Sequence, residues 1–396
     1  MLTLDQIYSA RFALNPVLRH TDLIKTSLRE DCEVYLKPEC LQVTGSFKVR
    51  GAYYKISQLS EEEKARGVIA CSAGNHAQGV ALAAQKNGIR ANICIPDGAP
   101  ISKVEATKSY GAQVTLVKGV YDDAYRKAVE LQQESGATFI HPFNDENVIA
   151  GQGTIGLEIL DELADADVVV VPVGGGGLIS GVAFAVKSLN PRCKVYGVQS
   201  AGAPSMVKSL QEHKIQKLDS VSTIADGIMV KEPGDLTYDL CSRYVDDVVT
   251  VTDDEVSTAI LTLIEKQKMI AEGAGAVSLA AVMFDKIDVK GKKVVAVISG
   301  GNIDVTILSR VIGRGLLKTG RSAEFTIELP DKPGQLVVVS SIVAGLGANV
   351  VAVHHDHAGE DHDITACTLR LCVETRDHEH VQCIRQALEQ AGYRLL

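Results

Sequence analysis

The amino-acid sequence predicts an α/β protein in which parallel strands are covered by helices. Between residues 30 and 310, short runs rich in β-branched residues alternate with Ala-rich segments of helix length. The short runs are apolar on both faces, as expected for parallel strands buried between two layers of helices. With 396 residues and 46% hydrophobic content, the chain can bury a sizeable core and divide into more than one domain.

The expected strands and helix starts can be placed along the chain. Six runs are predicted as strands, at residues 68–71, 91–95, 114–117, 168–173, 194–198 and 293–298. Three segments have capping-box spacing, in which a hydroxyl satisfies a free N–H of the first helical turn: Thr3 with Gln6, Ser60 with Glu63, and Thr252 with Glu255. Ligands of such sheets bind where strands end and helices begin. The segments after three of these strands are therefore candidates for a binding site.

A second, smaller domain is predicted after Arg321. Strand-like residues 325–329 are followed by the turn Asp331-Lys332-Pro333-Gly334 and an apolar, helix-like stretch to Leu346. Strand-like runs at 349–353 and 364–375, a helix at 380–391 and a closing strand at 393–396 complete the order β-α-β-β-α-β of a ferredoxin-like module. We place the boundary at residues 318–321, which gives domains at residues 1–320 and 321–396.

Charge and targeting signals exclude several kinds of partner. The formal net charge of -9 disfavours nucleic acid or an anionic membrane, since both usually bind a basic surface. The N-terminus lacks the pattern of a signal peptide, and no stretch reaches the roughly 18 apolar residues that span a bilayer. We therefore expect a cytoplasmic protein. Its nine scattered cysteines, none spaced Cys-x-x-Cys, are expected to be reduced structural residues.

A run of four glycines follows the expected strand at 168–173 and precedes a helix-like segment. Backbone N–H groups of such a turn can close around a phosphate, and the helix N-terminus adds a favourable dipole. The segment has neither the Gly-Lys-Ser/Thr of a P-loop nor the Gly-x-Gly-x-x-Gly of a dinucleotide site, and the next strand ends at Gln199 instead of a carboxylate. We interpret it as a phosphate cradle formed by Gly174, Gly175, Gly176, Gly177 and Leu178.

Lys48 is the candidate nucleophile. A primary amine can form an imine with an aldehyde, provided that burial or a cationic neighbour such as Arg50 lowers its pKa. Taken alone, a lysine is more often a solvated surface residue. Two other segments at strand ends change this interpretation.

Those two segments supply polar groups for a carboxylate and for a flat ring. Residues 72–79 follow a strand, and their hydroxyl, amide and N–H groups can hold a carboxylate. Within them His76 is more often a structural group, so we rank it below Asn75. Residues 299–302, Ser-Gly-Gly-Asn, end another strand, where the glycines allow a ring to approach closely and the Ser299 hydroxyl can face a pyridine nitrogen.

Along the chain, the segments come in the order 46–52, 72–76, 174–178 and 299–302. In this order they resemble the fold-type II pyridoxal phosphate enzymes, which share the tryptophan synthase β-like fold, and among them the threonine and serine dehydratases. The resemblance covers about residues 1–320. It implies pyridoxal 5'-phosphate as the cofactor, attached covalently to Lys48 and held at its phosphate by the glycine cradle. It further implies that Phe47 contacts the cofactor, Asn75 bonds its ring hydroxyl and Ser299 faces its pyridine nitrogen.

The same resemblance implies a substrate loop and an acidic group. The loop that grips the substrate carboxylate corresponds to Ser72, Ala73, Gly74, Asn75 and His76. Glu272 is similar to an acidic residue that lies near the cofactor ring in this family. The segment 199–205 supplies no carboxylate where serine racemases carry a divalent-metal site, so we predict no metal.

The implied reaction is elimination of a β-hydroxyl. A neutral hydroxyl such as that of Ser299 cannot keep the pyridine protonated, which makes the ring a weaker electron sink and favours elimination over transamination. Lys48 would remove the Cα proton as a general base. L-threonine would give 2-oxobutanoate and ammonia, and L-serine would give pyruvate. Racemisation should be minor, since Ala73 stands where serine racemases have a second acid–base hydroxyl.

The C-terminal module resembles an ACT regulatory domain. This resemblance implies a homo-oligomer under allosteric control by a small amino acid such as isoleucine or valine. The run His354-His355-Asp356-His357, with His362 and Asp363, has the composition of a metal cluster, but we predict a solvated polar loop there.

Several alternatives stay open from the sequence. The same scaffold could act on another β-hydroxy amino acid, such as 3-hydroxyaspartate or phenylserine, or serve as a serine racemase. Two hypotheses from other functional classes are a non-catalytic amino-acid sensor and a nicotinamide-dependent oxidoreductase. The sequence also leaves isoleucine biosynthesis and threonine breakdown both open as the pathway.

Overall fold

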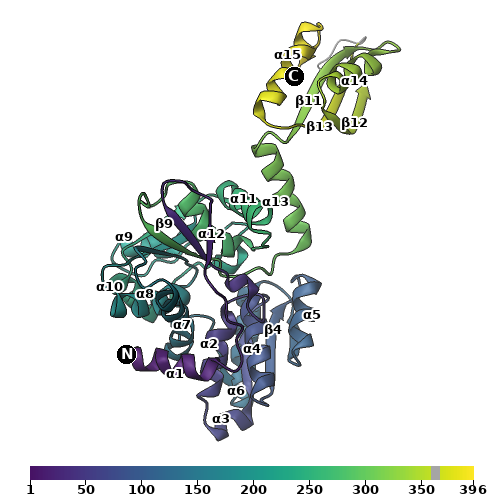
Figure 1. The fold of residues 1–396 in the computed structure, drawn as a ribbon. Coiled ribbons are helices and arrows are strands. Elements are labelled where there is room, and N and C mark those ends of the chain that lie inside the picture. The colour runs from purple at the N-terminus through teal and green to yellow at the C-terminus, as the bar shows by residue number, and fades with distance from the viewer. Residues whose placement is uncertain (358–365) are drawn as a thin grey trace. The chain divides into compact units, whose positions relative to one another are not determined.

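The computed structural model describes residues 1–357 and 366–396. Contacts divide the chain into two compact units, Met1–Ile307 and Leu308–Leu396 (Figure 1). The division falls near the start of helix α13 (Val305–Lys318), whereas the sequence placed the domain boundary at the end of this helix. The boundary at residues 320 and 321 stays a prediction.

The first unit contains a six-stranded sheet in the order β1-β2-β10-β7-β8-β9. β1 is antiparallel to β2, and the other neighbours are parallel. Every residue of β7 is buried, because helices cover both faces of the sheet. The strands are β1 (Ile24–Thr26), β2 (Glu33–Lys37), β7 (Val168–Pro172), β8 (Lys194–Ser200), β9 (Asp247–Val251) and β10 (Lys293–Val297).

A second sheet in this unit has four parallel strands in the order β5-β4-β3-β6. Its strands are β3 (Val68–Cys71), β4 (Ala91–Pro96), β5 (Gln113–Val117) and β6 (Thr138–Phe139). Between them, the two sheets contain all six strands expected from the sequence, which are β3, β4, β5, β7, β8 and β10. The short strand β6 and the strands β1, β2 and β9 were not predicted.

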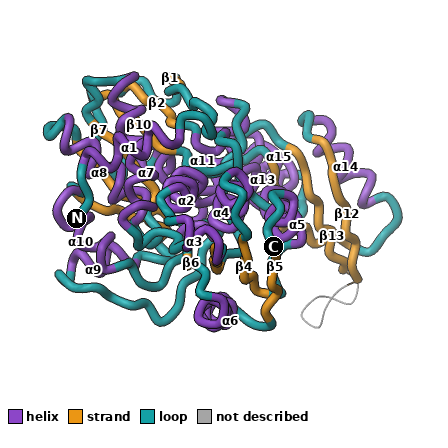
Figure 2. Tube along the Cα trace, turned by 90° about the horizontal axis from the view of Figure 1, so that it is seen from below, coloured by secondary structure: helices purple, strands orange, loops and turns teal. Residues whose placement is uncertain are grey.

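Helices fill the space between the two sheets and cover their outer faces. α2 packs on α4 and on α7, and α7 packs on α8, so these helices separate the two sheets (Figure 2). One apolar cluster joins α7 and α8 to β7, β8 and β10, and another joins α2 and α4 to β3 and β4. The helices of this unit are α1 (Leu4–Leu14), α2 (Lys48–Ser57), α3 (Glu61–Arg66), α4 (Asn75–Lys86), α5 (Ile101–Ser109), α6 (Tyr121–Ser135), α7 (Glu146–Glu162), α8 (Gly177–Leu189), α9 (Ser205–Gln211), α10 (Asp235–Tyr244), α11 (Asp253–Thr262) and α12 (Gly273–Met283), with short turns η1 (Glu39–Leu41), η2 (Asp226–Ile228) and η3 (Leu263–Gln267).

The three predicted capping boxes are confirmed at the starts of α1, α3 and α11. In each, the hydroxyl accepts from the N–H three residues on, and the Gln or Glu at that position accepts from the N–H of the capping residue. All nine cysteines lie within the described part of the chain and are free thiols. Among the described residues, no helix is both long and apolar enough to cross a membrane.

The second unit has the predicted ferredoxin-like order. Its antiparallel sheet runs β12-β13-β11-β14, with two helices packed against it. After α13, the elements are β11 (Ser322–Pro330), α14 (Gln335–Gly345), β12 (Asn349–His357), β13 (Ala366–Glu374), α15 (His378–Gln390) and β14 (Arg394–Leu395).

The predicted polar loop around the histidine run is wrong for its first part. His354, His355 and Asp356 belong to β12, where His355 pairs with Leu369 and Asp356 with Thr368. A ladder at the edge of a sheet is formed by backbone groups, so it tolerates exposed polar side chains that lack the pattern of a buried strand. His362 and Asp363 lie outside the described residues.

Candidate active site

Four helix N-termini supply the residues that the sequence singled out. Lys48 is the first residue of α2, Asn75 is the first of α4, Gly177 is the first of α8, and Glu272 caps α12. The first turn of a helix presents free N–H groups and a partial positive charge, which suits a site for anionic groups. Hydrogen bonds and packing contacts join these helix starts.

Lys48 lies between two strand ends. Its Nζ donates to the carbonyl oxygen of Pro142 at 2.8 Å, and lies 5.3 Å from the centroid of the Phe47 ring. The backbone N–H of Phe47 donates to the carbonyl oxygen of Ser299 at 3.1 Å, and Ser46 forms a β-bridge with Gly300. Burial lowers the pKa of the Lys48 amine to about 8, with Glu272 acting in the opposite direction. The amine is therefore partly neutral near neutral pH, as a nucleophile requires.

Pro142 and Phe143 connect Lys48 to the glycine turn, since Pro142 accepts a hydrogen bond from Lys48 and Phe143 contacts the turn. Phe143 packs against Gly175 and Gly177 in the turn. Gly176 has a φ of +99°, and a Cβ there would lie 2.8 Å from Met206 and from Thr237, so a side chain is excluded both by conformation and by space.

The turn presents unused N–H groups. The hydroxyl of Thr237 donates to the carbonyl oxygen of Gly175 at 2.6 Å, which holds the turn from the side of α10. The first backbone bond of α8 runs from Ser180 N–H to Gly176 O, so the helix itself does not use the N–H groups of Gly177 and Leu178. These groups can bind a phosphate.

A second cluster joins the end of β10 to α4 and α12. The Asn75 side-chain NH₂ donates to the Glu272 carboxylate at 2.6 Å, and the Glu272 N–H donates to Gly300 O at 3.0 Å. A Cβ on Gly300 would lie 2.3 Å from this carboxylate, which explains the glycine. The buried Ser299 hydroxyl lies 3.4 Å from Ala274 O, so it makes only a weak bond and can serve another partner.

Glu272 is a buried carboxyl group in this cluster. Burial raises its pKa to about 7; Asp226 adds to this effect, and Lys103, Asn75 and Lys48 oppose it. Such a group can exchange a proton near neutral pH.

The loop 72–76 contributes mainly backbone groups. The Gly74 N–H donates to the Ser72 hydroxyl at 3.2 Å, and Ser72 N–H donates to Cys94 O. His76 is buried, and its Nε2 donates to Ile140 O at 2.8 Å. Burial, assisted by Lys48, lowers the pKa of His76 to about 3, so this imidazole is neutral at physiological pH. Its side chain is placed for a structural role, whereas a Cβ on Gly74 would have no other heavy atom within 4 Å, which leaves room for a ligand.

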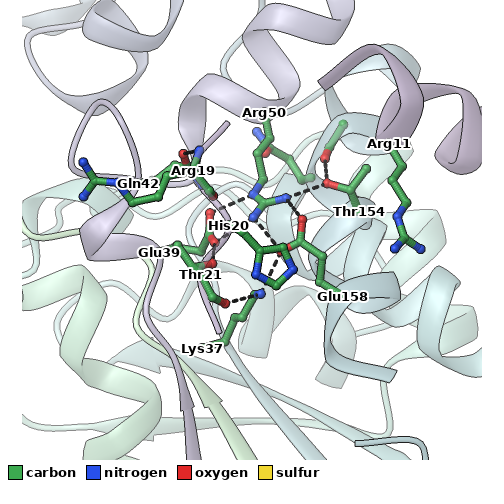
Figure 3. A network of polar contacts seen from close by, with 12 residues as sticks. Arg11, Arg19, His20, Thr21, Lys37, Glu39, Gln42, Arg50, Thr154 and Glu158 are labelled. Carbon is green, nitrogen blue, oxygen red and sulfur yellow. Dashed lines mark hydrogen bonds and ion pairs between the residues drawn. The ribbon is translucent and has the colours of Figure 1, made fainter. Parts of the chain in front are cut away.

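A buried ionic network fixes α2 at Arg50, two residues after the lysine (Figure 3). Arg50 uses all five of its N–H donors: two bonds to Glu39, two to Glu158 and one to the Thr154 hydroxyl, at 2.6–3.0 Å. Lys37 Nζ lies 2.7 Å from Glu158 and donates to Thr21 O at 2.5 Å. The positive charges of Arg50 and Lys37 balance the negative charges of Glu39 and Glu158, and this balance allows the four groups to be buried.

The sequence suggests a different role for Arg50, as a cation that could lower the pKa of Lys48. Its guanidinium instead turns toward η1 and α7, where Glu39 and Glu158 neutralise it. Burial is the cause of the lowered Lys48 pKa. Arg50 therefore acts on the geometry of α2 and not on the charge of the amine.

Sequence reasoning missed several residues that shape the site. Pro142 and Phe143 follow β6, whose two residues are too short to show a strand pattern. Lys103 and Asp226 form an ion pair of 2.5 Å between α5 and η2, and Gly227 lies beside Glu272. The short Ala-Asp-Gly segment at 225–227 carries no signal that could have identified it.

The segment 199–205 forms a helix cap. The Gln199 side-chain oxygen accepts from the N–H groups of Met206 and Val207 at 2.9 and 3.0 Å, which satisfies the start of α9. Its NH₂ lies 3.5 Å from the Ser205 hydroxyl. The amide at this position thus serves the backbone of its own loop.

Fold and site together define an enzyme class that binds a phosphorylated aldehyde cofactor through a lysine. Residues 15–300 match the family model described as pyridoxal-phosphate dependent enzyme. The chain therefore belongs to the family of pyridoxal phosphate-dependent enzymes, which confirms the predicted fold class and cofactor. The site fits this cofactor, because the four glycines of the cradle have no side chains, the amine has a lowered pKa and the Ser299 hydroxyl is available.

Individual relatives are similar over most or all of the chain. An L-threonine ammonia-lyase of Thermotoga maritima is 52% identical over 396 residues, covering 99% of this chain and 98% of that protein. A catabolic L-threonine dehydratase of Staphylococcus aureus is 47% identical over 80% of this chain and 93% of that protein. Among solved structures, a threonine deaminase from Solanum lycopersicum is 39% identical with a TM-score of 0.75, over 80% of this chain and 90% of that one. Maize serine racemase is 36% identical with a TM-score of 0.75, over 80% and 98%.

Proposed function

We propose that this protein is an L-threonine ammonia-lyase that converts L-threonine to 2-oxobutanoate and ammonia, and L-serine to pyruvate. The observation that carries the proposal is the position of the Lys48 amine, held beside the glycine turn and near the Asn75–Glu272 pair. Similarity over the full chain to the Thermotoga maritima L-threonine ammonia-lyase supports this substrate.

The proposed roles follow from the contacts. Gly174, Gly175, Gly176, Gly177 and Leu178 bind the phosphate of the cofactor through N–H groups at the start of α8. Asn75 and Ser299 hold polar atoms of its ring, and Phe47 packs beside it. The residues from Ser72 to His76 bind the substrate carboxylate through the N-terminus of α4.

Bound pyridoxal phosphate withdraws electrons from the substrate Cα and so acidifies its proton. Lys48 Nζ then takes this proton, and the low pKa of its amine suits a base that works near neutral pH. The bond from Cβ to its hydroxyl breaks, the departing oxygen takes up one proton to form water, and this proton balances the one removed from Cα. The released enamine takes up water as it hydrolyses to the 2-oxo acid and ammonia. Ser299 and Glu272 control the charge around the ring. The Ser299 hydroxyl is neutral, and the Glu272 carboxyl group exchanges a proton near pH 7.

Ala73 favours elimination over racemisation. Racemisation needs a second acid–base group on the opposite face of Cα, and a methyl group cannot transfer a proton. His76 cannot replace it, because its Nε2 is bonded to Ile140 O and its pKa is about 3.

Replacement of Lys48 tests the assignment. The Lys48→Ala variant should lose the absorbance of the covalently bound cofactor and the formation of 2-oxobutanoate from L-threonine. Lys55→Ala, which changes a lysine of the same helix that pairs with Asp145, should retain both. Full turnover by Lys48→Ala would refute the role of Lys48. A ketoacid-release screen that includes 3-hydroxyaspartate, phenylserine and D-serine formation from L-serine distinguishes the other substrates and racemisation.

Regulation through the C-terminal unit forms part of the proposal. Its β-α-β-β-α-β order supports an ACT-type module, and the Thermotoga maritima relative spans the whole chain, whereas the Staphylococcus aureus relative matches 80% of it. We expect a homo-oligomer in the cytoplasm whose activity responds to isoleucine or valine. Activity and sedimentation of the full-length protein with each amino acid would test this; no response to any candidate effector would count against it.

A further inference from the structure

Asn302 makes contacts at the candidate site that the proposed function does not use. Its side-chain NH₂ donates to two acceptors, the carbonyl oxygen of Thr44 at 2.8 Å and the amide oxygen of Asn75 at 2.7 Å. Its own amide oxygen faces Gly45, where a Cβ would lie 2.3 Å away. Both hydrogens of the Asn302 NH₂ group are therefore committed, and its orientation is fixed.

This orientation also fixes the amide of Asn75. A carboxamide has an acceptor at one end and a donor at the other, and the two ends are nearly equal in shape. Because Asn302 presents a donor, the oxygen of Asn75 must face Asn302, and its NH₂ must face Glu272. The observed bond from Asn75 to the Glu272 carboxylate, 2.6 Å long, is this consequence.

We propose that Asn302 is a positioning residue, which acts through Asn75 to supply the hydrogen bond that stabilises the ionised form of Glu272. The Asn302 NH₂ group is held by the Thr44 carbonyl oxygen and donates to Asn75, and the Asn75 NH₂ group donates in turn to the Glu272 carboxylate. The proposal deepens the proposed function, and rests on it only in assigning Asn75 and Glu272 to the cofactor ring.

Several charged groups face Glu272 from other elements, and the chain acts in addition to them. Lys48 on α2 and Lys103 on α5 favour the ionised carboxylate, whereas Asp226 on η2 disfavours it. The Cys40 thiol on η1 also lies within electrostatic range. None of these groups bonds to Asn302 in the described structure, so a change at Asn302 leaves their charges unaltered.

The test is an infrared titration of the Glu272 carboxyl group in the full-length protein, with Glu272→Gln subtracted to isolate its signal. Asn302→Leu removes both donors at similar volume and adds no charge. The midpoint of the Glu272 titration should rise by about one pH unit, which is the scale of one hydrogen bond to a charged group. Asn75→Ala should raise it by a similar amount.

The double variant decides whether Asn302 acts through Asn75. In the Asn75→Ala background, Asn302→Leu should produce no further shift, because the bond that it orients is already gone. An unchanged midpoint in Asn302→Leu, or an equal shift in both backgrounds, would overturn the proposal. Thermal unfolding shows whether each variant is folded, and Asn302→Ala replaces the leucine variant if it is not.

The readout separates this proposal from the proposed function. Titration of a carboxyl group does not depend on which amino acid is the substrate. If the protein failed to release ketoacid from L-threonine but the midpoints behaved as stated, the positioning role would stand and the substrate assignment would fall.

Discussion

Replacement of Arg50 by methionine should destabilise the first unit strongly without changing the shape of its side chain greatly. The guanidinium is fully buried, and its loss leaves the Glu39 and Glu158 carboxylates facing each other with only Lys37 as a cation. Breaking a buried ion pair by removing one partner costs about 3–5 kcal/mol, because the remaining charge is uncompensated.

The lowered pKa of Glu158 shows how strongly the ion network favours its ionised form. Although burial alone would raise its pKa, Arg50 and Lys37 lower it from 4.5 to about 2. At about 1.36 kcal/mol per pH unit, this corresponds to roughly 3 kcal/mol for the combined effect of burial, Arg50 and Lys37 on Glu158. A carboxyl group with a lowered pKa in the folded state stabilises above its unfolded pKa, and this stability is lost as the pH falls from about 4.5 through 2.

The assay is urea unfolding of the wild type and Arg50→Met at pH 7 and at pH 4. At pH 7 the variant should lose about 3–5 kcal/mol. At pH 4 the difference in the free energy of unfolding between wild type and variant should be smaller. The unpaired carboxylates of the variant take up protons at this pH, whereas those of the wild type remain paired. Thr154→Ala, which removes one neutral partner of Arg50, should cost only about 1 kcal/mol. A loss below 1 kcal/mol for Arg50→Met, or one that does not shrink in acid, would refute the reasoning.

Three other results are expected. Attachment of pyridoxal phosphate to the cofactor-free chain should become faster as the pH rises through about 8 and then level off, since only neutral Lys48 attacks. Stopped-flow absorbance measures the rate, and a rate that does not change from pH 6 to 9 would contradict this. Gly176→Ala should weaken cofactor binding about tenfold or more in equilibrium dialysis through backbone strain, while Gly313→Ala, at an open position, should not; equal affinities would contradict the cradle. Ser60→Ala should lower the free energy of unfolding by about 1 kcal/mol, and an unchanged urea midpoint would argue against the cap on α3.

The parts of the fold that could be predicted are those with local signals. β7 and β10 are rich in buried valines, and the caps at Thr3, Ser60 and Thr252 depend on residues only three positions apart. The order of elements in the C-terminal unit follows from the same kind of alternation. Such patterns reflect the periodicity of one element, which a sequence displays directly.

The parts that could not be predicted depend on distant pairing. The sequence identified Lys48, the glycine turn and Ser299 as separate segments, but Pro142, which receives the lysine amine, is 94 residues away in the chain. The pairing of Lys103 with Asp226 spans 123 residues, and each alone has the composition of an ordinary surface charge. Nothing in local periodicity indicates which charge meets which, so burial of Arg50 could not be foreseen either.

The ion network around Arg50 has a consequence for synthesis of the chain on the ribosome. Arg50 and Glu158 are 108 residues apart, so at about 5–20 residues per second the arginine waits roughly 5–20 s for its second carboxylate. In nascent chains that stop before α7, Arg50 on α2 has only Glu39 as a carboxylate partner. The bond from the Phe47 N–H to Ser299 O also waits until β10 and the residues after it have been made, so the surroundings of Lys48 are completed late in translation.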